Sequence, residues 1–339
     1  MRSIVYTTTG TSDVLHLVER ETPTPGPGAV RVRMLVSGVN PTDWKRRAAQ
    51  TASADIDAAI VPNQDGAGIV DAIGDGVDTL AVGDRVWLYL SQHESTEGTA
   101  QEFAIVAAWK AVPLPESVSF DVGASLGVPA MTAHRALTVH EDGPTRLTPG
   151  ALAGRTVLVT GGAGAVGHAA IQLARWAGAT VIATISSAEK AALATAAGAQ
   201  HTVDYTAADP AAAIHAVAPE GVDIVVDVDI IRNVDLVGAV LATRGSVAIY
   251  ANSGDAATIP MRAFMGLNAR LQYVLLYTVG ETALAAAAED ITAAVTAGAL
   301  EVGTEHGLPI TRFTLADTAA AHDAVEGGTV GKVLIDVSA

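Results

Sequence analysis

A strand, a glycine-rich turn and a helix follow one another between residues 156 and 177, and this succession constrains the fold more than any other feature. Thr156–Thr160 is a short apolar strand, and Ala165–Ala177 has the apolar periodicity of a helix. The turn between them contains Gly162, Gly164 and Gly167. Glycines at this spacing allow a tight turn and let backbone N–H groups and a helix N-terminus approach a pyrophosphate. The segment predicts a dinucleotide-binding turn, although an ordinary tight turn would have the same letters.

Strands and helices continue to alternate after this turn. The expected strands lie near 181–185, 222–228, 246–250 and 270–278, and the expected helices near 187–197, 233–242 and 281–297. Such alternation is the signature of a parallel sheet with helical crossovers, which makes the fold class α/β. We expect this doubly wound domain to cover residues 128–297.

The residues before and after this domain have a different character. Val30–Val36 alternates as a half-buried strand does, and short segments broken by Gly, Pro and Asp continue to about residue 115. The last forty residues turn strand-like again and end in Gly331–Val337. We expect them to fold back onto the first domain, so that residues 1–127 and 298–339 form one mainly β domain; 339 residues suffice for two domains.

Charge and cysteine content exclude several classes of function. The chain has 36 acidic and 20 basic residues, a net charge of −16, and this excess of negative charge disfavours a nucleic-acid partner. It has no cysteine, which excludes a thiolate nucleophile and a thiolate metal ligand. The N-terminus lacks the features of a signal peptide, and no apolar run is long enough to span a bilayer. We therefore expect a cytoplasmic protein without a membrane partner.

The segment after the second strand of the α/β domain bears on the choice of dinucleotide. Ser186, Ser187 and Lys190 stand where an NAD site usually has a ribose-binding carboxylate. Two hydroxyl groups and an ammonium suit the 2′-phosphate of NADP. In the alternative interpretation, Ser186 and Glu189 form a capping box and Lys190 is an exposed helix residue. We expect Ser186 to cap the helix while Ser187 and Lys190 face the phosphate, and we predict NADPH as the cofactor.

Seven motifs, taken in order, carry a family resemblance over essentially the whole chain. They are Gly38–Asp43, Pro62–Gly68, Val82–Val86, Met131–Leu137, the glycine turn, Arg232–Leu236 and Gly331–Val333. With them the chain resembles the zinc-independent quinone oxidoreductase, or zeta-crystallin-like, branch of the medium-chain dehydrogenase/reductase superfamily. The resemblance implies a GroES-like catalytic domain and a Rossmann NADPH-binding domain.

The same resemblance bears on metal chemistry. Zinc-dependent relatives hold a catalytic zinc through a Cys in the first motif and a His-Glu pair in the second, where this chain has Asn40 and Gln64-Asp65. Asn and Gln do not supply the thiolate or imidazole that zinc needs. The resemblance therefore implies no metal site and a reductase that receives a hydride from NADPH.

Site residues follow from the resemblance position by position. It implies that Asn40 and Thr132 lie at the nicotinamide and that Lys45 stands where relatives often carry a tyrosine, with Trp44 beside it. The residues implied in catalysis are Asn40, Asp43, Trp44, Lys45 and Thr132. The residues implied in cofactor binding are Asn40, Thr132, Gly162, Gly164, Ala165, Val166, Gly167, Ser186, Ser187, Lys190, Tyr205, Asn233, Tyr250, Asn252, Ser253 and Lys332.

The resulting hypothesis is an NADPH:quinone reductase with a small-molecule acceptor. A reductase of α,β-unsaturated carbonyl compounds stays open, as does a non-catalytic NADPH-binding sensor or structural protein. The loops 91–98 and 140–154 are longer than in relatives, and long polar loops often determine specificity. The strand 270–278 matches the edge strand through which relatives form dimers, and we expect a homodimer through it.

Overall fold

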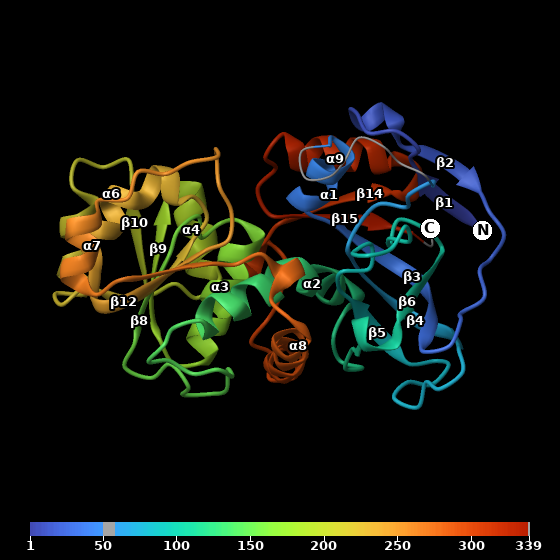
Figure 1. The fold of residues 1–339 in the computed structure, drawn as a ribbon, viewed down its shortest axis with the longest axis horizontal. Helices are drawn as coiled ribbons and strands as arrows, with labels where there is room; N and C mark the ends of the chain where they lie inside the picture. The colour runs from blue at the N-terminus through green and yellow to red at the C-terminus, as the bar shows by residue number, and fades with distance from the viewer. Residues whose placement is uncertain (50–57, 338–339) are drawn as a thin grey trace. The chain divides into compact units, whose positions relative to one another are not determined.

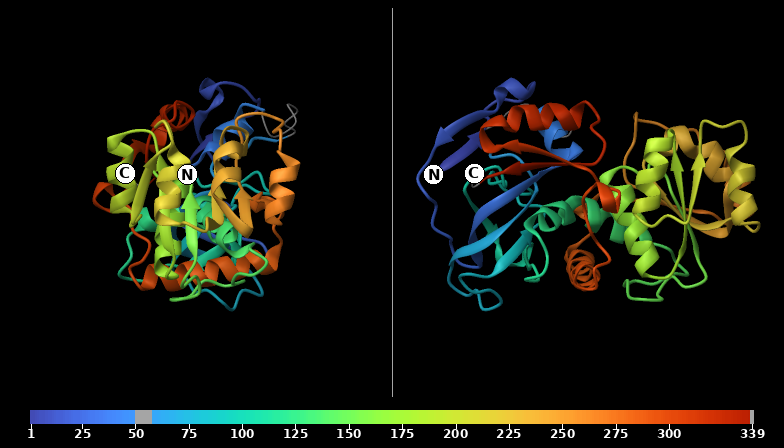
Figure 2. Two further views of the ribbon diagram at one scale, coloured as in Figure 1. Left: turned by 90° about the vertical axis from the view of Figure 1, so that its left-hand side faces the viewer. Right: turned by 180° about the vertical axis from the view of Figure 1, so that it is seen from behind.

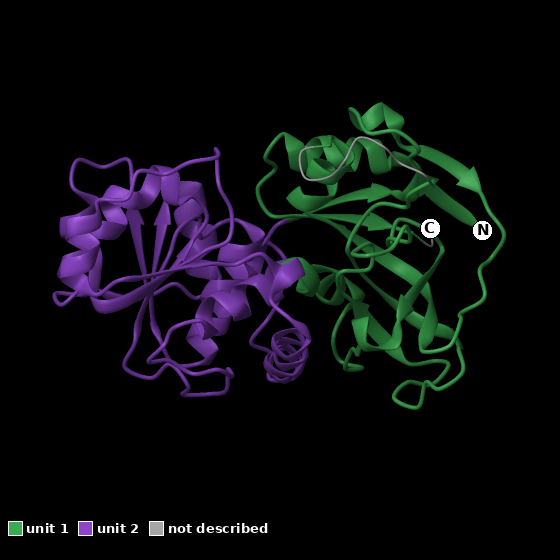
Figure 3. Cartoon of the chain, viewed as in Figure 1, with its two compact units in different colours: residues 1–128, 310–339 green, residues 129–309 purple. Residues whose placement is uncertain are grey.

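The computed structural model describes residues 1–49 and 58–337, which divide into two compact units. The first unit comprises residues 1–128 and 310–339, and the second comprises residues 129–309 (Figure 3). The predicted division placed residues 298–309 with the first unit, but they belong to the second. The reason is local: His168 and Gln172 hydrogen-bond to the backbone of His306 and Glu301.

The first unit is built on a seven-stranded sheet in the order β14-β15-β3-β4-β5-β7. The seventh strand, β6, pairs with residues 29–33 of β3, whereas β15 pairs with residues 36–39. All pairs are antiparallel except β14 with β15. The strands are β3 (Ala29–Val39), β4 (Asp65–Ile73), β5 (Arg85–Leu88), β6 (Phe103–Ala107), β7 (Ala111–Pro113), β14 (Ile310–Thr314) and β15 (Lys332–Asp336). A separate antiparallel pair is formed by β1 (Arg2–Val5) and β2 (His16–Glu19).

The C-terminal segment folds back onto the first unit, as predicted. Figure 1 shows the red β15 beside the blue β3, and the two strands pair antiparallel with Val333 opposite Val39. The predicted alternation in β3 is present, because its odd-numbered residues from Ala29 to Leu35 are partly exposed and its even-numbered residues from Val30 to Val36 are buried. Two helices, α1 (Pro41–Arg47) and α9 (Thr318–Glu326), belong to this unit. Residues 318–326 are therefore helical where the sequence indicated only strands.

The second unit contains a six-stranded parallel sheet in the order β10-β9-β8-β11-β12-β13. Numbered along the chain, this is the order 3-2-1-4-5-6 of the Rossmann fold. Helices lie on both faces of the sheet (Figure 2). The strands are β8 (Thr156–Val159), β9 (Thr180–Ile185), β10 (His201–Asp204), β11 (Val222–Asp227), β12 (Leu241–Ile249) and β13 (Arg270–Tyr273). The helices are α3 (Ala165–Trp176), α4 (Ala188–Ala196), α5 (Pro210–Val217), α6 (Ile230–Val240), α7 (Met261–Leu267) and α8 (Glu281–Thr296).

Two further elements differ from what the sequence predicted. The strand expected over 270–278 ends at Tyr273, and Leu276–Thr278 forms a 3₁₀ turn. A 19-residue helix, α2 (Phe120–Thr138), begins before the predicted change of character at residue 128 and contains the boundary between the units. Its internal Pro129 hid it, because proline usually ends a helix. Within residues 1–49 and 58–337, no helix is long and apolar enough to cross a membrane.

Candidate functional site

The four glycines of the turn between β8 and α3 differ in their surroundings. Gly161 has a φ of 69°, which favours glycine. A Cβ on Gly162 would lie 2.8 Å from the Cβ of Ala183, and one on Gly167 would lie 2.3 Å from the carbonyl oxygen of Gly161. Gly164, the N-cap of α3, has open space instead, with its nearest neighbour 3.4 Å away. The other three glycines therefore serve the turn and its packing, whereas Gly164 leaves the helix start open to a ligand.

The start of α3 is electrostatically suited to an anion. Gly164 is exposed, and Ala165 and Val166 are partly exposed. The first N–H groups of a helix have no intrahelical partner, and the helix dipole adds positive potential there. No acidic residue stands in the first turn of α3 to oppose that potential. The turn therefore offers backbone donors to a phosphate group.

A polar group follows the carboxyl end of β9. Ser187 is the N-cap of α4, and its hydroxyl accepts a hydrogen bond from the backbone N–H of Lys190 at 3.2 Å. The ammonium of Lys190 donates to the hydroxyl of Ser186, also at 3.2 Å. The prediction that Ser186 caps the helix is wrong, because Ser187 is the N-cap. Glu189 is exposed.

Tyr205 lies next to this group, directly after β10. Its backbone N–H donates to the carbonyl of Ile185 at 3.1 Å, which places it beside the residue that precedes Ser186. Its side chain is 50% exposed. Two hydroxyl groups, an ammonium and an accessible phenol thus gather at the carboxyl edge of β9 and β10. We refer to Ser186, Ser187, Lys190 and Tyr205 as the β9 cluster.

Asp227 occupies the carboxyl end of β11 and is fully buried. Its Oδ1 accepts hydrogen bonds from the hydroxyl of Thr160 at 2.9 Å and from the amide of Asn233 at 2.7 Å. Burial raises the pKa of Asp227. Asn233, a predicted cofactor residue, therefore braces Asp227. Asp227 and Thr160 are not among the site residues predicted from sequence, although an aspartate at the end of an apolar strand is a recognisable signal.

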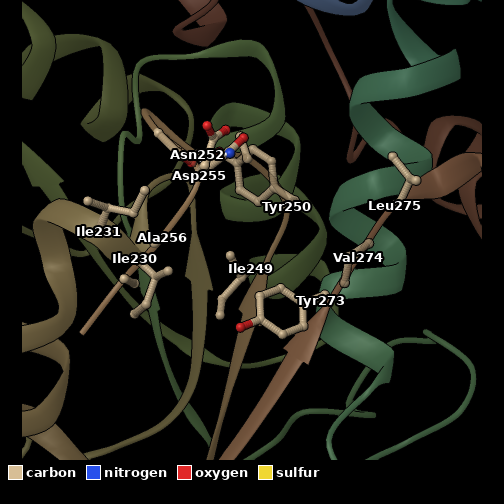
Figure 4. A pocket seen from close by; sticks show the side chains of 13 residues that line it. Ile230, Ile231, Ile249, Tyr250, Asn252, Asp255, Ala256, Tyr273, Val274 and Leu275 are labelled. Carbon is tan, nitrogen blue, oxygen red and sulfur yellow. Dashed lines mark hydrogen bonds between the residues drawn. The ribbon is translucent and has the colours of Figure 1, made fainter. Parts of the chain in front are cut away.

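A pocket of about 270 Å³ opens beside the carboxyl ends of β12 and β13 (Figure 4). Tyr250 and Asn252, both predicted site residues, line it together with apolar side chains from α6, β12 and the segment after β13. Burial, and then the nearby Asp227, raise the pKa of Tyr250, so its hydroxyl stays protonated. Ser253 does not line the pocket; its backbone N–H donates to Asp229 at 3.3 Å. The apolar lining is Ile230, Ile231, Ile249, Ala251, Ala256, Ala257, Tyr273, Val274 and Leu275, and Asp255 also lines the pocket.

Three predicted site residues of the first unit lie in a buried polar cluster with Asp65. The ammonium of Lys332 donates to Oδ1 of Asn40 at 2.7 Å, and the amide of Asn40 donates to Oδ2 of Asp65 at 2.6 Å. Asp43 accepts from the backbone N–H of Asn40 at 2.7 Å and of Gln64 at 3.1 Å. All four side chains are at most 2% exposed. We refer to Asn40, Asp43, Asp65 and Lys332 as the Asn40 cluster.

The charges of the Asn40 cluster influence one another. Burial, reinforced by the neighbouring Asp65, raises the pKa of Asp43 to about 8. Burial also raises the pKa of Asp65 to about 6, although the Lys332 ammonium opposes this shift. Burial lowers the pKa of Lys332, against the attraction of both carboxylates. The structure thus buries one ammonium and two carboxyl groups together.

The remaining predicted residues lie on two helices. Trp44 and Lys45 are partly exposed on α1, and the Lys45 ammonium is 5.9 Å from the centroid of a Trp44 ring. Thr132 is buried in the part of α2 that belongs to the second unit. Among residues 1–49 and 58–337, no three His, Asp or Glu side chains are grouped so as to hold a metal ion.

Comparison with known proteins agrees with this geometry. Residues 26–116 match the alcohol dehydrogenase GroES-like domain, and residues 165–293 match the zinc-binding dehydrogenase family. The chain is 30% identical to the quinone oxidoreductase of Rattus norvegicus over 343 residues, which cover 99% of this chain and 97% of the relative. The chain belongs to the quinone oxidoreductase branch of the medium-chain dehydrogenase/reductase superfamily. The resemblance and the fold class predicted from sequence are thereby confirmed.

Two further proteins similar to this chain are relevant to the site. A mycobacterial protein whose structure was solved in complex with NADPH is 30% identical, with a TM-score of 0.81 and 99% of each chain covered. A 2-methylene-furan-3-one reductase of Solanum lycopersicum is 33% identical over 214 residues, which cover 61% of this chain and 52% of the relative. The glycine turn and the β9 cluster therefore belong to a chain that is similar to a protein solved in complex with NADPH.

Proposed function

We propose that this protein is an NADPH-dependent, zinc-independent reductase that transfers a hydride to a quinone. The observation that carries the proposal is the β9 cluster, which stands beside the open glycine turn at the carboxyl edge of a Rossmann sheet. Ligands of such sheets bind at this edge, near the point where the strand order reverses. That point lies between β8 and β11, directly at the glycine turn.

The residues of the second unit fit NADPH. The N–H groups at Gly164, Ala165 and Val166 would hold the pyrophosphate, because Gly164 has no side chain to keep it away. The hydroxyl groups of Ser186 and Ser187 and the ammonium of Lys190 would hold the 2′-phosphate by charge-assisted hydrogen bonds. A chain with a net charge of −16 needs such local positive potential to bind an anion.

The pocket at the ends of β12 and β13 supports a second part of this assignment. Its mostly apolar lining with three polar groups, Tyr250, Asn252 and Asp255, is typical of a small-molecule site. We propose that this pocket and Asn233 contact the part of the dinucleotide beyond the pyrophosphate. Asp227 stabilises the arrangement because it fixes Thr160 and Asn233.

The Asn40 cluster does not fit a zinc ion. Where zinc-dependent relatives supply a thiolate and a His-Glu pair, this chain supplies the amides of Asn40 and Gln64 and the carboxylate of Asp65. The Asp65 carboxylate already accepts from Asn40 and from the backbone N–H of Val128, 2.6 and 2.9 Å away. The Lys332 ammonium, 3.9 Å from Asp65, would repel a divalent cation.

The proposed reaction needs positioning more than acid catalysis. NADPH supplies a hydride when it is bound, the quinone takes up this hydride and one proton at its oxygens, and hydroquinone and NADP⁺ result. Water supplies the proton, so orientation of the two reactants contributes most of the rate. We propose that Asn40 and Thr132 orient the nicotinamide, that Trp44 and Lys45 flank the acceptor, and that Asp43 holds Asn40 through its backbone.

Anaerobic mixtures of the enzyme, NADPH and 1,4-benzoquinone test the proposal. We expect the absorbance of NADPH to fall in proportion to the quinone added, with NADH a much poorer donor. Lys190→Ala should reduce the difference in reduction rate between NADPH and NADH. Inactivity toward a broad panel of quinones and enones would overturn the proposal, and tight NADPH binding without turnover would favour a non-catalytic role.

A reductase of α,β-unsaturated carbonyl compounds is the second candidate, favoured by the similarity to the 2-methylene-furan-3-one reductase. In that reaction the hydride adds to the β-carbon and a proton to the α-carbon, so a proton donor is needed. Tyr89, which directly follows β5, is unsuited as this proton donor. Its hydroxyl donates to the carbonyl of Trp109, and burial raises its pKa to about 12. Oxidation of NADPH by simple enones, but not by quinones, would select this candidate.

A further inference from the structure

We propose that Lys332 is a positioning residue, which fixes the side-chain amide of Asn40 in one orientation. The inference rests on the proposed function for its catalytic meaning, since Asn40 is assigned there to the nicotinamide. It assigns to the C-terminal strand of the first unit a task in catalysis different from binding the dinucleotide.

Strand register brings the three side chains together. In the antiparallel pair β15–β3, Val333 lies opposite Val39, so Lys332 is next to Asn40, the first residue after β3. In the pair β3–β4, Gly38 lies opposite Asp65. The ammonium therefore approaches Asn40 from one neighbouring strand and the carboxylate approaches it from the other.

Two glycines make room for this arrangement. A Cβ on Gly38 would lie 3.2 Å from both Cε and Nζ of Lys332, and 2.2 Å from the carbonyl oxygen of Ala124. A Cβ on Gly127 would lie 2.1 Å from Oδ1 of Asp65. The backbone N–H of Val128 then donates to both carboxylate oxygens at 2.9 Å. The ammonium and the carboxylate are thus held by their own surroundings before they contact Asn40.

The chemistry of the contacts permits only one orientation of the amide. Oδ1 of Asn40 accepts from a cation at 2.7 Å, and Nδ2 donates to a carboxylate at 2.6 Å. A flipped amide would point its N–H groups at the ammonium and its oxygen at the carboxylate, and both contacts would be repulsive. One Nδ2 hydrogen is used by Asp65, and a fixed amide would hold the second in one direction, where it could donate to a further acceptor.

The same contacts indicate that Lys332 does not bind the dinucleotide. Lys332 is 2% exposed, and its ammonium donates to the Asn40 side chain and to the carbonyl of Val39 at 3.2 Å. Its ion pair with Asp65 lies within the same unit. An effect of Lys332 on the reaction should therefore pass through Asn40.

A double-mutant cycle on kcat tests this path. Lys332→Met should lower kcat about tenfold to a hundredfold at saturating NADPH, because a misplaced catalytic group costs that much. The Kd of NADPH should change by less than about threefold, a loss of kcat without a loss of cofactor affinity. The double variant Asn40→Ala/Lys332→Met should have the same kcat as Asn40→Ala, because Lys332 acts through the Asn40 side chain, which both variants lack. The inference would be overturned if the two substitutions lowered kcat independently, so that their factors multiplied in the double variant. It would also be overturned if Lys332→Met weakened NADPH binding by the same factor as it lowered kcat.

A second measurement needs no turnover. In the ¹⁵N-labelled protein, the side-chain NH₂ of Asn40 should give two separate resonances with slow hydrogen exchange, and Lys332→Met should speed that exchange at least about tenfold. Lys332→Arg, which keeps the cation, should restore part of the protection. The exposed amide of Asn252 is the control, and its exchange should not change.

The kcat measurement and the exchange measurement together distinguish failure of this inference from failure of the proposed function. If the wild type reduces no acceptor, the proposed function is wrong, and the amide exchange of Asn40 still decides whether Lys332 fixes it. If exchange at Asn40 is the same in the wild type and Lys332→Met, the inference is wrong whatever the activity. Should Lys332→Met fail to fold, Lys332→Arg and Asp65→Asn are compared with the wild type by the same exchange measurement, and unchanged exchange in both overturns it.

Discussion

The ammonium of Lys190 donates a hydrogen bond to the hydroxyl of Ser186 over 3.2 Å. The backbone N–H of the same lysine bonds to the hydroxyl of Ser187 at 3.2 Å. One residue therefore ties both serines to the first turn of α4. This turn combines a positive helix end with a positive side chain in a protein that is negative as a whole.

Lys190→Ala should weaken NADPH binding about tenfold to a hundredfold, which corresponds to about 1 to 3 kcal/mol for a charge-assisted contact. NADH has no 2′-phosphate, so its affinity should stay nearly unchanged. Fluorescence titration with both dinucleotides measures the two effects. Glu189→Gln is the matched control, since it alters the exposed neighbour and should not weaken NADPH. Equal losses for NADPH and NADH would show that Lys190 does not face the phosphate.

Gly164→Ala and Gly167→Ala separate ligand contact from packing in the glycine turn. A Cβ on Gly164 would meet nothing closer than 3.4 Å, whereas a Cβ on Gly167 would lie 2.3 Å from the carbonyl oxygen of Gly161. Gly167→Ala should therefore lower the free energy of unfolding by about 1 to 3 kcal/mol. Gly164→Ala should change it by less than about 1 kcal/mol and still weaken NADPH at least about tenfold. Urea unfolding and NADPH titration give both numbers, and undiminished affinity in Gly164→Ala would contradict the assigned place of the pyrophosphate.

The α/β unit could be predicted from sequence in some detail. The strand, turn and helix around Gly162–Gly167 follow from local rules, because apolar periodicity and glycine spacing are properties of adjacent residues. The fold-back of Gly331–Val337 was also predictable from its strand-like pattern. Helix α9 was missed because its buried face consists of Thr318, Ala321 and His322, so no stripe of large apolar side chains marks the segment as an amphipathic helix.

The Asn40 cluster could be predicted only in part. Motif positions identify Asn40, Asp43 and Lys332, but their hydrogen bonds depend on the register of β15 and β4 against β3. Such long-range pairing leaves no trace in the residues around Lys332. The capping role of Ser187 was missed for a different reason, since Ser186 and Ser187 are adjacent and the helix start is uncertain by one residue.

A homodimer through the edge of the parallel sheet remains a prediction. Tyr273 at the end of the edge strand β13, Leu275 two residues later, and Met261 and Met265 on α7 are each at least 58% exposed. An exposed strand edge with such a patch favours association with a second chain. Light scattering at micromolar concentration should give twice the mass of one chain for the wild type and the mass of one chain for Tyr273→Lys. Val82→Lys, at a 62% exposed site of the first unit, should stay dimeric, and a monomeric wild type would contradict the prediction.

Two buried histidines should each make a destabilising contribution in mild acid. His168 and His322 are at most 2% exposed, and they bond through Nε2 to the carbonyl of His306 and to Oδ1 of Asn63, each at 2.9 Å. Burial lowers the pKa of His168 to about 4, and burial together with the nearby Arg47 lowers the pKa of His322 to about 3.

The sign of the pH effect follows from proton uptake. Below the usual histidine pKa of about 6.5 the unfolded chain binds protons that the two buried histidines do not take up, so their contribution to stability falls as the pH falls. Burial raises the pKa of Asp43 to about 8 and that of Asp65 to about 6, so these two groups act in the opposite direction, and the histidine effect is measured as a difference between wild type and variant. Each of the two histidines should cost about 2 kcal/mol at pH 5 relative to pH 7. In urea unfolding at pH 7, 6 and 5, His322→Gln, whose amide can still donate to Asn63, should lose about 2 kcal/mol less than the wild type over this range. His201→Gln, which changes an exposed histidine of β10, is the control. The same pH dependence in wild type and His322→Gln would show that His322 takes up its proton without unfolding.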